Sequence, residues 1–257
     1  MDAAVIVVCS FPRSGTHFLI DVLRRNFEAL RYQPPVWASA ETLYFNLDRE
    51  AVGGAPWSTA SLSRPFTLVK THRLFFDAGL EARLAELAGG RPVKVLTPYR
   101  RLTRILESYH RYTGADRPIE QLLDSTDPFF QDGASVEETV SRFYSAAAER
   151  SVLVDVEALK RAPEAWLQAL SAELGLARRP NPAPLPPRRT SHGFGGELAA
   201  RLTGRQSSEV VVPAGQARAP AQVSATQEMT QRMQALQSRL DSRALRPVGD
   251  VCEGARP

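Results

Sequence analysis

The sequence has few cysteines, few lysines and no long apolar segment, and each scarcity excludes a class of protein. Cys9 and Cys252 are the two cysteines among 257 residues, too few for a disulfide framework, which favours a reducing compartment. No apolar run approaches the roughly 20 residues that a helix needs to cross a bilayer. The N-terminus lacks the basic stretch of a secretory signal peptide. We therefore expect a cytoplasmic protein without a membrane span.

Lysine is largely replaced by arginine. Lys70, Lys94 and Lys160 are the only lysines among 32 basic residues, and the formal net charge is +4. A guanidinium group binds phosphate or sulfate through two parallel hydrogen bonds, so this composition suits an anionic small-molecule ligand. The basic residues do not cluster with interleaved aromatic residues, which argues against a nucleic-acid partner. Hydrophobic residues at 43% and charged residues at 23% are typical of a globular protein.

Apolar runs and helical periodicities alternate along most of the chain. Strands are predicted at 3–9, 66–69, 93–96 and 152–156, and helices at 18–30, 101–112, 135–150 and 163–174. Ser135 and Glu138 match a capping box, and Gly175 is a typical helix stop. The alternation predicts a single α/β domain with a mainly parallel central sheet flanked by helices. In such sheets ligands bind at the carboxyl ends of the strands.

Two regions depart from this alternation. Residues 33–64 contain three prolines and scattered aromatic residues, which predict a long irregular excursion of the kind that often contacts substrate. We expect one domain at 1–204, followed at 205–257 by a linker, an amphipathic helix and a flexible tail. One stripe of that helix is apolar: Met229, Met233, Leu236 and Leu240. The stripe favours packing on the helix's own domain over a contact in a homodimer.

A phosphate-binding loop is predicted at SFPRSGTHF, residues 10–18, between the first strand and the first helix. Backbone N–H groups at such a junction point outward, and the helix dipole favours an anion there. Ser14 and Gly15 let the backbone approach a phosphate closely, and Thr16 adds a hydroxyl donor. A P-loop nucleotide triphosphatase would need lysine at position 16. The run Val152–Asp155 could nevertheless imitate the aspartate-bearing strand of such an enzyme.

A second segment, VKTHRL at 69–74, pairs a cation with a base. Lys70 and His72 are two residues apart and project to the same side of a strand end. A general base beside a cation suits the transfer of an anionic group to a hydroxyl. A solvated strand terminus is the alternative interpretation.

A third segment, YRRLTRILESYH at 99–110, places an arginine at a strand end and a hydroxyl on the next helix. The spacing lets Arg100 and Ser108 converge on one phosphate. An ordinary basic helix face, with Arg101 and Arg104 in solvent, is the alternative.

In their order, these segments resemble the family of sulfotransferases that depend on 3′-phosphoadenosine 5′-phosphosulfate (PAPS), closest to the cytosolic type. That family carries a YPKSGTTW-like loop, a KTH segment and an Arg-x₇-Ser pattern in the same order along the chain. VLVDVEALK at 152–160 is similar to its strand ending in YEDL, and RRTSHG at 188–193 to its RKGxxG. The resemblance spans about residues 4–196 and favours a bacterial member with a P-loop-NTPase-like sulfotransferase fold.

The resemblance implies in-line transfer of a sulfuryl group from PAPS to a hydroxyl or amine, with 3′-phosphoadenosine 5′-phosphate (PAP) as the product and no metal. His72 would take the acceptor's proton, while Lys70 and Arg13 would stabilise the charge that develops. The donor would be held by the backbone of Ser14, Gly15, Thr16 and His17, by the ring of Phe18, and by Arg100, Ser108, Arg188 and Arg189.

Val156 stands where the family usually has a tyrosine, and three further departures carry more weight: Arg13 replaces a lysine, His17 a threonine and Thr190 a glycine. His17 is therefore a second candidate for the base. A metal-dependent small-molecule kinase and a non-catalytic nucleotide-binding protein of the same fold are the alternatives, and the presence of both Lys70 and His72 argues against the latter.

The acceptor stays open among phenols, alcohols, lipids, sugars and specialised metabolites. Aromatic residues could line its pocket or belong to the core: Trp37, Tyr44, Phe45, Trp57, Phe75, Phe76, Phe129 and Phe130.

Overall fold

The computed structural model describes residues 3–30, 44–50, 65–113, 119–126, 130, 133–181, 185, 231, 233–235, 237, 238, 241 and 242. The strands in these ranges are β1 (Ala4–Cys9), β2 (Phe45–Asn46), β3 (Phe66–Thr71), β4 (Val93–Tyr99) and β5 (Val152–Asp155). The helices are α1 (Thr16–Asn26), α2 (Leu47–Glu50), α4 (Ala78–Ala88), α5 (Leu102–Thr113), α6 (Ile119–Asp124), α7 (Val136–Arg150), α8 (Val156–Arg161) and α9 (Pro163–Leu174), with a 3₁₀ turn at Glu28–Leu30. Among these helices none has the length and apolarity to span a membrane.

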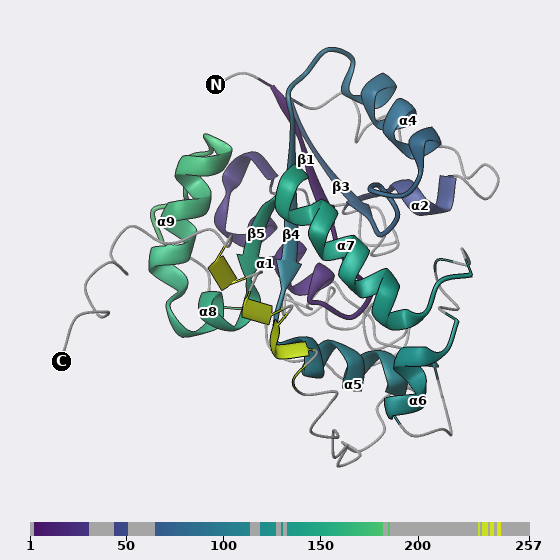
Figure 1. The fold of residues 1–257 in the computed structure, drawn as a ribbon. Coiled ribbons are helices and arrows are strands. Elements are labelled where there is room, and N and C mark those ends of the chain that lie inside the picture. Colours follow the sequence, from purple (N-terminus) through teal and green to yellow (C-terminus); the bar gives the residue numbers. More distant parts are fainter. Residues whose placement is uncertain are drawn as a thin grey trace, which may run out of the picture.

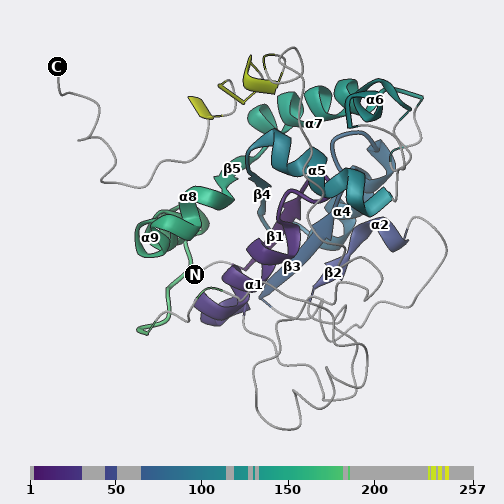
Figure 2. The same ribbon diagram turned by 90° about the horizontal axis from the view of Figure 1, so that it is seen from below.

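The strands form one parallel sheet in the order β2-β3-β1-β4-β5 (Figure 1; Figure 2 labels all five). The apolar run of β1 is buried along its whole length because it lies in the centre, with a strand on either side and helices on both faces. The predicted α/β class, with a mainly parallel sheet flanked by helices, is confirmed.

Successive residues of β1 point to opposite faces of the sheet and enter two separate cores. Ile6 and Val8 pack with residues of α1, α8 and α9, whereas Val7 and Cys9 pack with residues of α4, α5 and α7. Figure 2 shows these two groups of helices on opposite sides of the sheet. The strand order also locates the ligand edge. After β1 the chain continues to β2 on one side of the sheet, and after β4 it continues to β5 on the other side. In such sheets ligands bind where the connections diverge, so the expected ligand position lies outside the carboxyl ends of the neighbouring strands β1 and β4.

The helix expected at 18–30 ends at Asn26, because Phe27 has an extended backbone with φ −117°, and Glu28–Leu30 form a separate 3₁₀ turn. Other local signals agree with the helix ends, with one further correction. Ser135 Oγ accepts the Glu138 N–H at 3.1 Å, and Gly175 ends α9 in the left-handed conformation with φ 65°. Val156, expected to end a strand, is instead the first residue of α8. The cause is Asp155, whose carboxylate accepts the N–H groups of the next turn and starts the helix there.

Candidate functional site: an anion-binding loop beside a histidine

The loop between β1 and α1 adopts a conformation that requires glycine at one position. Arg13 has φ 70° and Gly15 has φ 113°, both in the left-handed region. A Cβ on Gly15 would also lie 3.0 Å from Val156 Cγ2. Ser14, between them, donates its N–H to the Phe11 carbonyl at 3.2 Å and has a buried side chain. Left-handed residues in such turns arrange successive N–H groups into a concave anion site.

Phe11 holds the loop on the sheet. Its fully buried ring packs at centroid distances of 5.7–6.4 Å against a cluster of aromatic residues: Tyr109, Phe130, Phe143 and Tyr144. Phe75 and Phe76 pack in the same core. These two residues and Phe130 are therefore core residues, which is one of the two roles expected for them. The backbone above Phe11 is therefore fixed by apolar packing.

The N-terminus of α1 presents backbone N–H groups at the edge of the sheet. Gly15 stands at the cap position, and no side chain among the described residues caps this end. The first intrahelical bond is the one from Leu19 N–H to the Gly15 carbonyl at 3.0 Å. The N–H groups of Thr16 and His17 precede it, and the helix dipole favours an anion beside them.

The sheet brings the end of β3 directly against this loop. Lys70 is paired with Val8 of β1, so His72 follows at the level of Ser10. The imidazole Nδ1 of His72 lies 2.6 Å from the Ser10 carbonyl oxygen and 3.2 Å from Ser10 Oγ. Ser10 Oγ in turn lies 2.6 Å from Thr16 Oγ1. Histidine, hydroxyls and helix N-terminus thus form one buried, hydrogen-bonded unit.

The contact with a carbonyl fixes the tautomer of His72. A carbonyl oxygen can only accept, so Nδ1 carries the hydrogen and Nε2 is the basic atom of the neutral ring. The pKa of His72 is lowered to about 3, first by burial and then by the charge of Lys70, against the opposing effect of the bond to Ser10. At neutral pH the ring is therefore uncharged.

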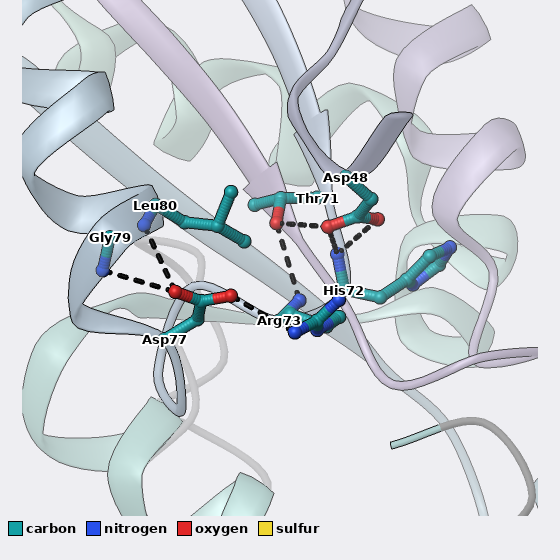
Figure 3. A network of polar contacts seen from close by, with 7 residues as sticks. All are labelled: Asp48, Thr71, His72, Arg73, Asp77, Gly79 and Leu80. Carbon is teal, nitrogen blue, oxygen red and sulfur yellow. Dashed lines mark hydrogen bonds and ion pairs between the residues drawn. The ribbon is translucent and has the colours of Figure 1, made fainter. Parts of the chain in front are cut away.

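Asp48, which no sequence pattern had indicated, holds the backbone of His72. Its carboxylate accepts the His72 N–H at 2.8 and 3.0 Å and the Thr71 hydroxyl at 2.7 Å (Figure 3). On the other side of the turn, Asp77 accepts from Arg73 at 3.0 Å and caps α4. Asp48 lies in the short helix α2, within the segment expected to be irregular, so it had no periodicity by which to be found.

The remaining predicted residues lie around the same edge. Arg13 Nε donates to Ser108 Oγ at 3.1 Å, which joins the loop to α5. Arg100 Nη2 donates to the Arg104 carbonyl at 3.0 Å in the first turn of α5. Arg100, just before α5, and Ser108, within α5, are thus bonded to different partners here.

His17 and Phe18 lie at the start of α1. The hydroxyl of Tyr44 is 3.3 Å from His17 Nε2, and the Lys160 ammonium is 5.1 Å from the centre of the Phe18 ring. The pKa of His17 is lowered to about 3, by burial first and then by interactions with Lys70, His72 and Arg13. At neutral pH the positive charges near the helix N-terminus include those of Lys70, on β3, and Arg13, in the loop.

Several predicted residues fall outside the described residues: Trp37, Trp57, Phe129, Arg188, Arg189 and Thr190. Within the described residues, no group of three or more histidine, cysteine or acidic side chains is arranged to hold a metal ion. Besides Asp48, the sequence reasoning missed Ser10, whose hydroxyl inside the loop motif was the available signal.

Fold and site together define an α/β protein with a candidate anion-binding loop after the central strand of a parallel sheet. Among solved structures, the chain is similar to mouse sulfotransferase SULT7A1 in complex with PAP, with 13% identity, a TM-score of 0.45, and coverage of 93% of this chain and 84% of that one. No family model and no curated protein matches the sequence. At this identity and TM-score the likeness assigns no activity, and the function is inferred from the residues of the site.

Proposed function

We propose that the protein transfers a sulfuryl group from PAPS to a hydroxyl or amine of an acceptor, with His72 as the general base. One observation carries the proposal: the 2.6 Å bond between His72 Nδ1 and the Ser10 carbonyl. It joins a base of fixed tautomer to the loop that presents a helix N-terminus to an anion. A base held beside an anion site is the arrangement that transfer of an anionic group to a hydroxyl uses.

The donor's charges find complementary groups at this edge. The N–H groups of Thr16 and His17 and the Thr16 hydroxyl suit the 5′-phosphate, because donors at a helix N-terminus need no rearrangement to bind an anion. Lys70 and Arg13 flank the position of the sulfuryl group. Arg100, on the β4–α5 junction, and Ser108, further along α5, suit the 3′-phosphate.

The reaction is an in-line displacement at sulfur. The acceptor oxygen or nitrogen forms a bond to sulfur, its proton passes to His72 Nε2, and the bond between sulfur and the bridging oxygen breaks. The electron pair leaves with that oxygen on PAP. Lys70 and Arg13 stabilise the charge that develops on the bridging oxygen.

Burial first, and then the charge of Lys70, lower the pKa of His72 and make the imidazole a weak base. An anionic donor next to Lys70 would offset the second of these effects and raise the pKa of the imidazole. The base would thus become effective when the donor is bound.

The experiment is incubation with PAPS and a panel of phenols, alcohols and amines, with PAP release and acceptor sulfation measured by chromatography and mass spectrometry. We expect at least one sulfated class with the parent and none with His72→Ala, which should still bind PAP. His110→Ala, a change in another histidine on α5, is the matched control and should leave transfer unchanged. Phosphorylation of the panel from ATP with magnesium would instead support the kinase alternative.

A further inference from the structure

The β4–α5 junction, which carries Arg100, is held by residues far along the chain. Gln231, residues 233–235, Gln237, Ser238, Asp241 and Ser242 are helical and are called here the C-terminal helical segment. Met233 is 3% exposed and belongs to the same core as Tyr99 and Leu102. Figure 1 shows the segment, in yellow, near the start of α5.

Two polar side chains of the segment bind the two ends of the junction. Gln237 Oε1 accepts the N–H of Leu102, the first residue of α5, at 3.0 Å. Asp241 Oδ1 accepts the hydroxyl of Tyr99, the last residue of β4, at 3.2 Å. Gln237 Nε2 donates to the same Asp241 oxygen at 2.9 Å, so the two side chains support each other.

The junction has no local means of making these bonds. The first N–H groups of a helix need an acceptor, which is commonly a Ser, Thr, Asp or Asn just before it. The residues before α5 are Arg100 and Arg101, which supply no side-chain acceptor. Tyr99 is a buried phenol whose pKa is raised, by burial first and by nearby carboxylates, so it remains a hydrogen donor.

The orientation of Arg100 depends on the same turn. Its guanidinium donates to the Arg104 carbonyl, within the first turn of α5. A shift of that turn would move the guanidinium, and it would also move Ser108 further along the helix.

We propose that Gln237 and Asp241 are positioning residues for Arg100, through which the C-terminal helical segment sets recognition of the donor's 3′-phosphate. This inference rests on the proposed function, because it takes Arg100 as a ligand of that phosphate. Gln237 and Asp241 do not touch the donor themselves. They act by fixing both ends of the short connection on which Arg100 lies.

The test is calorimetric titration of the full chain with PAP and with AMP, its analogue without the 3′-phosphate. The two test variants are Gln237→Ala and Tyr99→Phe, the second of which removes one hydroxyl and nothing else. In each we expect PAP to bind about fivefold more weakly, which is the effect typical of one lost capping hydrogen bond. AMP binding should stay unchanged. Ser238→Ala is the matched control, because the exposed Ser238 hydroxyl bonds only to the Gln234 carbonyl of its own helix in the described residues.

The ratio of the affinity for PAP to the affinity for AMP separates the possible outcomes. A ratio that falls in both variants and not in Ser238→Ala supports the inference. A ratio equal to that of the parent overturns it, even if PAP and AMP both bind more weakly, because that result reflects general destabilisation. A parent that binds PAP and AMP equally would refute the role of Arg100 in the proposed function and the inference with it.

Discussion

At the scale of single residues, the site depends on a backbone conformation that few side chains tolerate. Gly15 sits at φ 113° against Val156, and Arg13 at φ 70° is the other left-handed residue of the loop. A non-glycine residue in the left-handed region costs about 1–2 kcal/mol. Such strain persists only where the surroundings enforce it, and here the buried ring of Phe11 and the packed sheet do so.

Gly15→Ala should lower stability by about 1–2 kcal/mol and weaken PAP binding at least tenfold, because the N–H groups of Gly15 and Thr16 would move. Gly90→Ala is the matched control: Gly90 has φ 82°, and a Cβ added there would have nothing within 4 Å, so its variant should lose similar stability without losing PAP binding. Thermal unfolding and calorimetry measure the two effects. Parent-like PAP affinity in Gly15→Ala would contradict the assignment of the anion to this loop.

At the scale of elements, two carboxylates, those of Asp48 and Asp77, accept hydrogen bonds at the turn after β3 and have different roles there. Asp48 on α2 holds the backbone N–H of His72, whereas Asp77 caps α4. Both accept backbone N–H groups, Asp48 from 24 residues away in the sequence and Asp77 from the next turn, and Figure 3 shows them on either side of the same turn. The difference between them allows the positioning of His72 to be tested separately from stability.

Asp48→Ala should leave the His72 N–H without its acceptor and loosen the imidazole, with a loss of about 1–3 kcal/mol of stability. Imidazole ¹⁵N spectra should lose the signature of a single Nδ1–H tautomer. Asp77→Ala should cost about 1 kcal/mol through the lost helix cap but keep that signature. An unaltered His72 spectrum in Asp48→Ala would show that the bond to Ser10 positions the ring alone.

Elements with a strong local signal could be predicted from the sequence. Adjacent residues alone predict β1, from its apolar run, and the glycine-containing loop that follows it. Parallel pairing of β3 with β1 then brings Lys70 and His72 to this loop. Asp48 could not be predicted, because it follows a strand of two residues that has no periodicity. The bond from Gln237 to Leu102 spans 135 residues, and only the folded chain brings the two together.

At the scale of the whole molecule, the parallel sheet gathers groups from distant parts of the chain at one edge. Loops after β1, β3 and β4 contribute Thr16, His72 and Arg100, respectively, and the C-terminal helical segment holds the last of these junctions. Lys70 and Arg13 bring positive charge there, and the carboxylate of Asp48 is engaged by backbone and hydroxyl donors. This arrangement agrees with the proposed donor, an anionic nucleotide with phosphates at two positions.

The most direct test is calorimetric titration of the full chain with PAP, without metal, and with ATP in the presence of magnesium. We predict that PAP binds in the absence of any metal and that ATP with magnesium binds far more weakly, because position 16 carries threonine and Arg100 meets a 3′-phosphate only in PAP. Preferential binding of ATP with magnesium would contradict sulfuryl transfer and would make the protein a phosphate-loop enzyme of the kinase type.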